Sequence, residues 1–222
     1  MRQNKRIVLG CTALALIFPI VMIYHYTCTA NSEVQLRNAV KHKDHLQIQQ
    51  LLESGTNCNL RDLPRSQSSA HLSMVIQALF RPRSNGGSEP TLLMRAIENH
   101  DTDTVRLLLD HGANPNATAQ SNAGTPLIWA ASCTPEEGEE PNDKRMITML
   151  LDHGASIDYR DKKGETALMW AVLAESDQNV RALLARGANP KLVNSHNQTA
   201  LELAEEISAD ECIKALKVIS SR

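Results

Sequence analysis

The chain has 222 residues, of which 42% are hydrophobic and only 3% aromatic, and its formal net charge is −2. Its length fits one domain with an accessory segment, and its abundant Ala and Leu are typical of stacked helices rather than an aromatic-rich barrel or sandwich. Three of the 23 basic residues and none of the 25 acidic residues precede residue 31, so the remainder is net acidic. Such a body lacks a broad basic face for phosphates, and we expect no nucleic acid partner.

The first 30 residues have the pattern of a targeting or anchoring segment. A short basic stretch, MRQNKR, precedes an uncharged apolar run over residues 7–24. Small residues at positions 28 and 30 would suit cleavage after Ala30, as in a signal peptide. An apolar run of about 18 residues is instead long enough to span a bilayer, which favours an uncleaved anchor. Both interpretations keep the basic end in the cytoplasm and export residues 31–222.

The rest of the chain repeats itself. The stretch LLDHGA occurs at 108–113 and again at 150–155, LLARGANP at 183–190 is a third copy, and LLESGTNCN at 51–59 is a degraded one. Their shared glycines are expected to end helices in a left-handed conformation; they are Gly55, Gly112, Gly154 and Gly187. A second set of marks consists of threonines that are expected to cap the helices that follow; they are Thr91, Thr125, Thr166 and Thr199. Ser208 and Glu211 form a capping-box pattern for the final helix.

A unit of turn, helix, turn and helix with a TPL..A start and an LL..GAN.N end resembles the ankyrin repeat. The resemblance covers about residues 33–220 and implies an all-α solenoid of about five helix–turn–helix units. We place the repeats at about 33–62, 89–120, 122–161 and 163–195, with a C-terminal capping unit at 197–220. The histidine usual after TPL is replaced by other residues, so packing is expected in place of a buried hydrogen bond; they are Met94, Ile128, Met169 and Glu202.

Two insertions break the period. In the first, residues 63–88, apolar residues at helical spacing predict an extra helix of about 12 residues, which either packs on the stack or forms a partner-binding arm. The second, residues 134–143, has five acidic residues and no basic one. It is either a solvated loop or a site for a cation or a basic partner.

Signals for chemistry are scarce. No phosphate-binding, metalloprotease or hydrolase motif occurs, and we expect neither enzymatic activity nor a cofactor or metal. His42 and His45 could share a metal, but their position in a polar turn indicates solvated side chains. Outside the leader, Cys58, Cys133 and Cys212 lack metal-ligand spacing, which leaves isolated thiols or one disulfide.

The two tryptophans of the chain occupy the same place in two repeats. Aligning the repeats by their threonines puts four side chains at one position of successive inner helices; they are Arg95, Trp129, Trp170 and Leu203. Such a row either packs between repeats or presents aromatic hot spots to a partner.

The resemblance also implies binding through the hairpin tips and the exposed side of the inner helices. The tip positions are Ser121, Asn122, Lys162, Lys163, Glu165, Ser195, His196 and Gln198. The inner-helix positions are Glu98, Asn99, Ser132, Cys133, Leu173 and Ala174. The charges at the tips are mixed in sequence, so they indicate no class of partner.

Together these features predict a monomeric, non-catalytic protein–protein interaction module, exported to a bacterial periplasm or held at the periplasmic face of the inner membrane. The first hypothesis is an adaptor or stabiliser of another envelope protein. The alternatives are an immunity protein that neutralises an exported toxin, and an accessory factor of a redox or metal enzyme that uses Cys133 or the acidic insertion.

Overall fold

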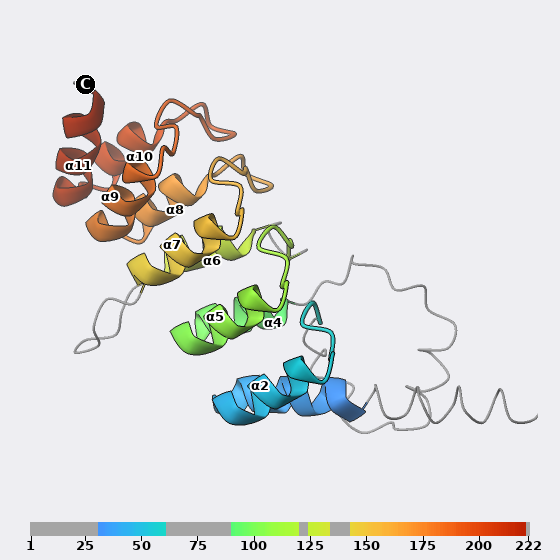
Figure 1. Cartoon of the computed structure of the whole chain (residues 1–222). Helices are drawn as coiled ribbons and strands as arrows, with labels where there is room; N and C mark the ends of the chain where they lie inside the picture. Colours follow the sequence, from blue (N-terminus) through green and yellow to red (C-terminus); the bar gives the residue numbers. More distant parts are fainter. Residues whose placement is uncertain (1–30, 61–89, 120–123, 134–142, 221–222) are drawn as a thin grey trace, which may run out of the picture.

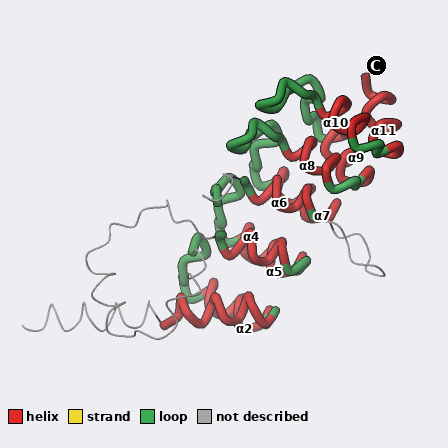
Figure 2. The backbone as a smooth tube through the Cα atoms, turned by 180° about the vertical axis from the view of Figure 1, so that it is seen from behind, coloured by secondary structure: helices red, strands yellow, loops and turns green. Residues whose placement is uncertain are grey.

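The computed structural model describes residues 31–60, 90–119, 124–133 and 143–220. Every regular element in these ranges is a helix. The helices form antiparallel pairs that stack in chain order from α2 to α11 (Figure 1). The loops between pairs extend to one side of the stack (Figure 2). The predicted all-α solenoid is thus confirmed for this part of the chain.

Each pair has a short inner and a longer outer helix. The inner helices are α4 (Leu92–Glu98), α6 (Pro126–Ser132), α8 (Ala167–Leu173) and α10 (Ala200–Glu206). The outer helices are α2 (His45–Glu53), α5 (Thr102–Asp110), α7 (Asp143–Asp152), α9 (Asp177–Ala185) and α11 (Asp210–Ser220). A helix over residues 31–42 precedes α2.

The inner helices begin where the threonines predict. The hydroxyl of each threonine accepts a hydrogen bond from the backbone N–H three residues later, which satisfies one of the unpaired donors at the helix start. Pro126 follows Thr125 at the first helical position, where the missing N–H costs nothing. The glycines Gly55, Gly112, Gly154 and Gly187 have φ between 83° and 89°, so their predicted left-handed conformation is also confirmed.

The capping box predicted at Ser208 is wrong. Ser208 has a φ of 60°, and α11 begins only at Asp210. The backbone carbonyl of Ala209 accepts the first helical hydrogen bond, from the Ile213 N–H at 2.9 Å. The tight turn after α10 requires a left-handed residue at 208, which an extended N-cap cannot provide. The capping box of this repeat lies instead at Thr199 and Glu202.

Apolar side chains of both helices in each pair form one continuous core from Leu36 to Leu216. Alanines such as Ala96, Ala130 and Ala171 are fully buried and let neighbouring helices approach closely. Met94, Ile128 and Met169 are also buried, so packing replaces the family histidine in three repeats as predicted. At the fourth position the expectation fails, because the exposed Glu202 caps the helix instead.

Several predictions lie outside the described residues: the apolar run at 7–24, the extra helix within 63–88, Ser121, Asn122, and residues 134–142 of the acidic insertion. The insertion does separate the two helices of its repeat, because α6 ends at Ser132 and α7 begins at Asp143. Within the described ranges no helix has both the length and the apolarity that crossing a bilayer requires. The three cysteines of these ranges form no disulfide with one another.

Candidate functional site

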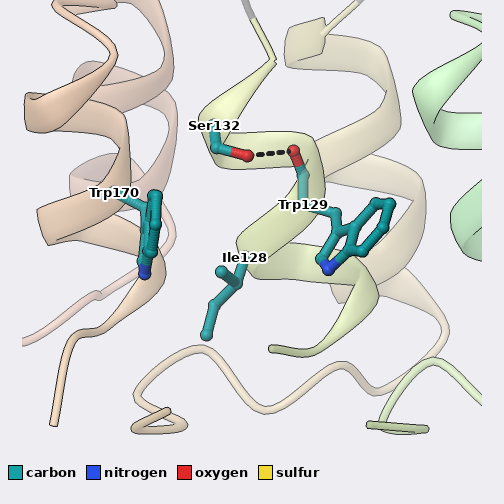
Figure 3. A pocket seen from close by; sticks show the side chains of 4 residues that line it. All are labelled: Ile128, Trp129, Ser132 and Trp170. Carbon is teal, nitrogen blue, oxygen red and sulfur yellow. Dashed lines mark hydrogen bonds between the residues drawn. The ribbon is translucent and has the colours of Figure 1, made fainter. Parts of the chain in front are cut away.

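The two tryptophans lie beside one shallow pocket on the inner helices. Ile128, Trp129 and Ser132 of α6 and Trp170 of α8 line this pocket, which has a volume of about 230 Å³. Both indoles are half-buried and pack partly against the core. Figure 3 shows the indoles standing apart, with Ile128 between them and the Ser132 hydroxyl donating to the Trp129 carbonyl at 2.9 Å. The pocket is therefore open to solvent, with a floor of apolar side chains.

A buried carboxylate holds Trp170 in place. The indole Nε1–H donates to Oδ2 of Asp161 at 3.1 Å. The other oxygen of Asp161 accepts the backbone N–H groups of Lys163 at 2.9 Å and Glu165 at 2.8 Å. One side chain thus fixes both the indole and the turn of the hairpin that precedes α8. For Trp129 the corresponding position is residue 120, which lies outside the described residues.

The side chains at the four aligned inner-helix positions differ in polarity and exposure along the stack. Arg95 is half-buried and its guanidinium lies 2.6 Å from Oε2 of Glu98, one helical turn away. At the other end Leu203 is 7% exposed and belongs to the core. Among the four aligned positions, which the structure describes, a large and half-exposed apolar side chain therefore occurs on α6 and α8 alone. The exposed Leu173, at the end of α8, extends the apolar area at the C-terminal end of its helix.

The hairpin tips of the last two repeats are joined by their backbones. The Ser195 N–H donates to the Lys163 carbonyl at 2.8 Å. The Arg160 guanidinium spans the same junction, with Nη2 2.5 Å from the Val193 carbonyl and Nε 3.2 Å from the Gly164 carbonyl. Gly164 has a φ of 74°, and a Cβ there would lie 3.2 Å from the Ser195 backbone nitrogen. This close approach makes the two tips one rigid edge.

One predicted tip residue faces inward. The family resemblance predicts an exposed Glu165 at the tip, but the residue is only 7% exposed, and its Oε2 has no hydrogen-bond partner. Burial raises the pKa of the Glu165 carboxyl, the neighbouring Asp161 raises it further, and Lys163 and His196 offset part of the rise. The expected exposure of Glu165 is therefore wrong, because its backbone N–H is bonded to Asp161 inside the turn.

The remaining tip predictions are consistent with solvent access. Lys162, Lys163, Ser195 and His196 are exposed, and Gln198 is half-buried. Among the inner-helix positions, Glu98 and Leu173 are exposed, and the others are half-buried; these are Asn99, Ser132, Cys133 and Ala174. Whether any of these residues contacts a partner stays a prediction.

Three family models match the chain: one described as ankyrin repeats (3 copies) over residues 36–140, one as ankyrin repeat over 124–162, and one as ankyrin repeats (many copies) over 150–204. The chain belongs to the ankyrin-repeat family. Ankyrin repeats stack into extended surfaces that bind protein partners, so the chain is a protein–protein interaction module.

Similar proteins share the repeats and differ elsewhere. Ankyrin repeat and SOCS box protein 6 of Homo sapiens is 33% identical over 133 residues, which is 54% of this chain and 30% of that protein. An ankyrin repeat protein of Acanthamoeba polyphaga mimivirus is 32% identical over 105 residues, 47% of this chain and 62% of that protein. The 2-5A-dependent ribonuclease of Homo sapiens is 35% identical over 85 residues, 38% of this chain and 10% of the ribonuclease. The matches thus cover less than two thirds of each of these relatives.

Sequence reasoning missed the polar side chains that organise the ankyrin hairpins. Asp161 and Asn194 do the same work in successive repeats, since Oδ1 of Asn194 accepts the N–H groups of His196 at 2.9 Å and Gln198 at 3.0 Å. Asn116 joins two repeats by donating to the Gly154 carbonyl at 2.9 Å and accepting the Ser156 N–H at 2.8 Å. The equivalent spacing of Asp161 and Asn194 before their threonines was the available signal.

The metal alternative at the first repeat is not favoured by the geometry. His42 is exposed, while Nε2 of His45 lies 3.0 Å from Oδ1 of Asp101, the N-cap of α5. His45 therefore joins the first and second repeats. In the part of the chain that the structure describes, no three His, Cys, Asp or Glu side chains gather as metal ligands would.

Proposed function

We propose that the chain is an exported, non-catalytic adaptor or stabiliser that holds a protein partner on the tryptophan face. We use this name for the pocket-lining residues Ile128, Trp129, Ser132 and Trp170. The main evidence for this proposal is that both tryptophans of the chain border one open pocket and are half-exposed. Interface hot spots favour such large aromatic side chains because they desolvate much apolar surface with few rotatable bonds.

Packing alone accounts poorly for the choice of tryptophan at these positions. Leu203 occupies the equivalent place in the last repeat and is nearly fully buried. A smaller aliphatic residue is therefore sufficient to connect two repeats at this place. The indoles add apolar surface that the stack does not cover, and apolar area becomes favourable when a partner removes it from water.

Trp170 is also held in place before any partner binds. Asp161 fixes the Trp170 ring, and the bonded tips of the last two repeats fix the edge beside it. Association costs less entropy when the binding groups are already ordered. This preorganisation supports a binding role over a purely passive one.

The proposed location rests on the sequence of the N-terminal segment. A basic stretch followed by the uncharged run at 7–24 supports export, with the run kept as a membrane anchor. We therefore place the repeats, as a monomer, on the outer side of a bacterial inner membrane. An immunity protein for an exported toxin differs from an adaptor chiefly in holding one partner very tightly.

The test uses the full chain as bait in a native envelope extract, with captured proteins measured by quantitative mass spectrometry. Trp129→Ala/Trp170→Ala should lose the specific partner while keeping its helical circular dichroism. Leu46→Ala, at an exposed apolar residue of α2, is the matched control and should keep the partner. A partner retained equally by all three proteins would assign the tryptophans to packing and would overturn the proposal.

A further inference from the structure

Burial separates charges that are mixed in the sequence of the hairpin tip at residues 160–165. The two acids of this tip, Asp161 and Glu165, are 8% and 7% exposed. The three bases, Arg160, Lys162 and Lys163, are all exposed. His196, on the adjoining tip, is exposed as well. The exposed charged side chains of the 160–165 tip are thus all basic, although the chain as a whole is acidic.

This basic edge is fixed to the tryptophan face. Asp161 bonds the Trp170 indole through one oxygen and the Lys163 backbone through the other. The Lys163 carbonyl in turn accepts the Ser195 N–H next to His196. A ligand seated in the pocket against Trp170 therefore lies next to the hairpin that carries Lys162 and Lys163.

Three exposed acids on or beside the inner helices are engaged by neighbouring groups of the stack. Glu98 pairs with Arg95, and Glu206 accepts a hydrogen bond from Gln198 at 2.6 Å. Glu202 lies in the first turn of α10 and is occupied in the capping box. The exposed bases of the 160–165 tip are thus the charged groups beside Trp170, whereas these three carboxylates already accept hydrogen bonds within the stack.

The size of the pocket indicates what enters it. Its volume of about 230 Å³ is below the roughly 300–1,000 Å³ of small-molecule sites. Its lining of Ile128, Ser132 and the two tryptophans suits one large side chain of a polypeptide. Exposed charge pairs add little affinity but select among partners. We therefore expect the apolar side chain in the pocket to supply most of the affinity and the basic tip to select the partner.

We infer that the partner presents an acidic peptide segment, with one large aliphatic or aromatic side chain in the pocket and carboxylates beside Lys162, Lys163 and His196. This inference rests on the proposed function, because it assigns the chemistry of the segment that binds at the tryptophan face. The sharpest prediction is a preference for Asp and Glu next to an apolar residue, in spite of the acidic character of the protein.

The test is a selection of random displayed peptides on the immobilised full chain, with the enriched peptides read by sequencing. We expect enrichment of an apolar residue flanked by Asp or Glu. Lys162→Glu/Lys163→Glu should abolish the acidic preference and weaken binding of a selected acidic peptide about tenfold, as two exposed charge pairs imply. Lys41→Glu/Arg106→Glu makes the same charge change at exposed sites on the first and second repeats. This control should leave the acidic preference and the affinity for the selected peptide unchanged.

The possible results distinguish the inferred acidic segment from the proposed protein-binding function. Peptides that need both tryptophans but show no acidic preference would overturn the acidic segment and leave the protein-binding proposal standing. Peptides indifferent to Trp129→Ala/Trp170→Ala, or no enrichment at all, would contradict both. Binding of a short single-stranded DNA probe to the same face, in competition with the peptides, would reassign the basic edge to a different class of ligand.

Discussion

The indole nitrogen of Trp170 donates a hydrogen bond to Oδ2 of Asp161, nine residues earlier and 3.1 Å away. This bond links an inner-helix residue to the hairpin that precedes its helix. The same carboxylate organises the hairpin backbone through two further bonds. The position of Trp170 on the tryptophan face and the shape of the neighbouring tip therefore depend on one buried side chain.

Replacing Asp161 should disturb the hairpin and the tryptophan together. Asp161→Ala leaves two backbone N–H groups and the indole N–H without their acceptor, so the free energy of unfolding should fall by about 2 kcal/mol. Asp161→Asn retains one oxygen for the backbone, as Asn194 does in the next repeat, and should cost less. Urea unfolding followed by circular dichroism measures both variants. Equal losses of unfolding free energy in Asp161→Ala and Asp161→Asn would contradict the role of Asp161 as the acceptor of the hairpin backbone bonds.

Two glycines with similar backbone angles should respond differently to alanine. Gly154→Ala places a methyl group in open space at a φ of 85° and should cost about 1 kcal/mol for the left-handed conformation alone. Gly164→Ala adds a Cβ 3.2 Å from the Ser195 nitrogen and 3.3 Å from the Asn194 carbonyl carbon. The backbone of the next repeat must then shift, and the loss should exceed that of Gly154→Ala by at least about 1 kcal/mol. Similar urea midpoints for the two variants would contradict the close packing of the tips.

Glu165 should make stability depend on pH. Its pKa in the folded state is raised above the ordinary value of 4.5, so the folded protein holds this proton more tightly than the unfolded chain. Stability is then lost as pH rises from 4.5 through the raised pKa. Glu165→Gln should match the parent below this interval and be more stable above it. Urea midpoints from pH 3 to pH 8 test this, with Glu53→Gln as a control for net charge; a constant offset across that range would refute the prediction.

A non-glycine residue in a left-handed turn offers a way to stabilise the array. Glu175 has a φ of 53° between α8 and α9. Glu175→Gly removes a steric cost of about 1–2 kcal/mol, and part of this gain is offset by the greater freedom of glycine in the unfolded chain. A net gain of about 0.5 kcal/mol in unfolding free energy is expected. Gln178→Gly, on an exposed position inside α9, should instead lose about 0.5–1 kcal/mol.

The fold could be predicted because its signals are local and repeated. A threonine hydroxyl that caps its own helix and a glycine that ends one act within a few residues of their position. Thr166 therefore caps its helix, and Gly187 adopts its left-handed conformation, as the sequence predicts. Ser208 shows the limit of such patterns, because the turn before α11 determines its backbone angle.

The site was harder to predict because it depends on which side chains turn inward. Glu165 and Lys163 are two residues apart and have equally polar side chains, yet one is buried and the other exposed. Their difference follows from the hairpin turn around Asp161, a tertiary arrangement that spacing does not reveal. For the same reason the tip at 160–165 has mixed charges in sequence, whereas its exposed charged side chains are all basic.

Intrinsic fluorescence of the full chain gives the most direct measurement, because Trp129 and Trp170 are its two tryptophans and both border the proposed contact. A selected peptide without tryptophan is titrated while emission and acrylamide quenching are recorded. We expect a saturable blue shift and reduced quenching, at the same midpoint as the polarisation of a labelled copy of the peptide. Saturable polarisation with unchanged tryptophan emission and quenching would place the partner elsewhere and contradict the tryptophan face as the binding site.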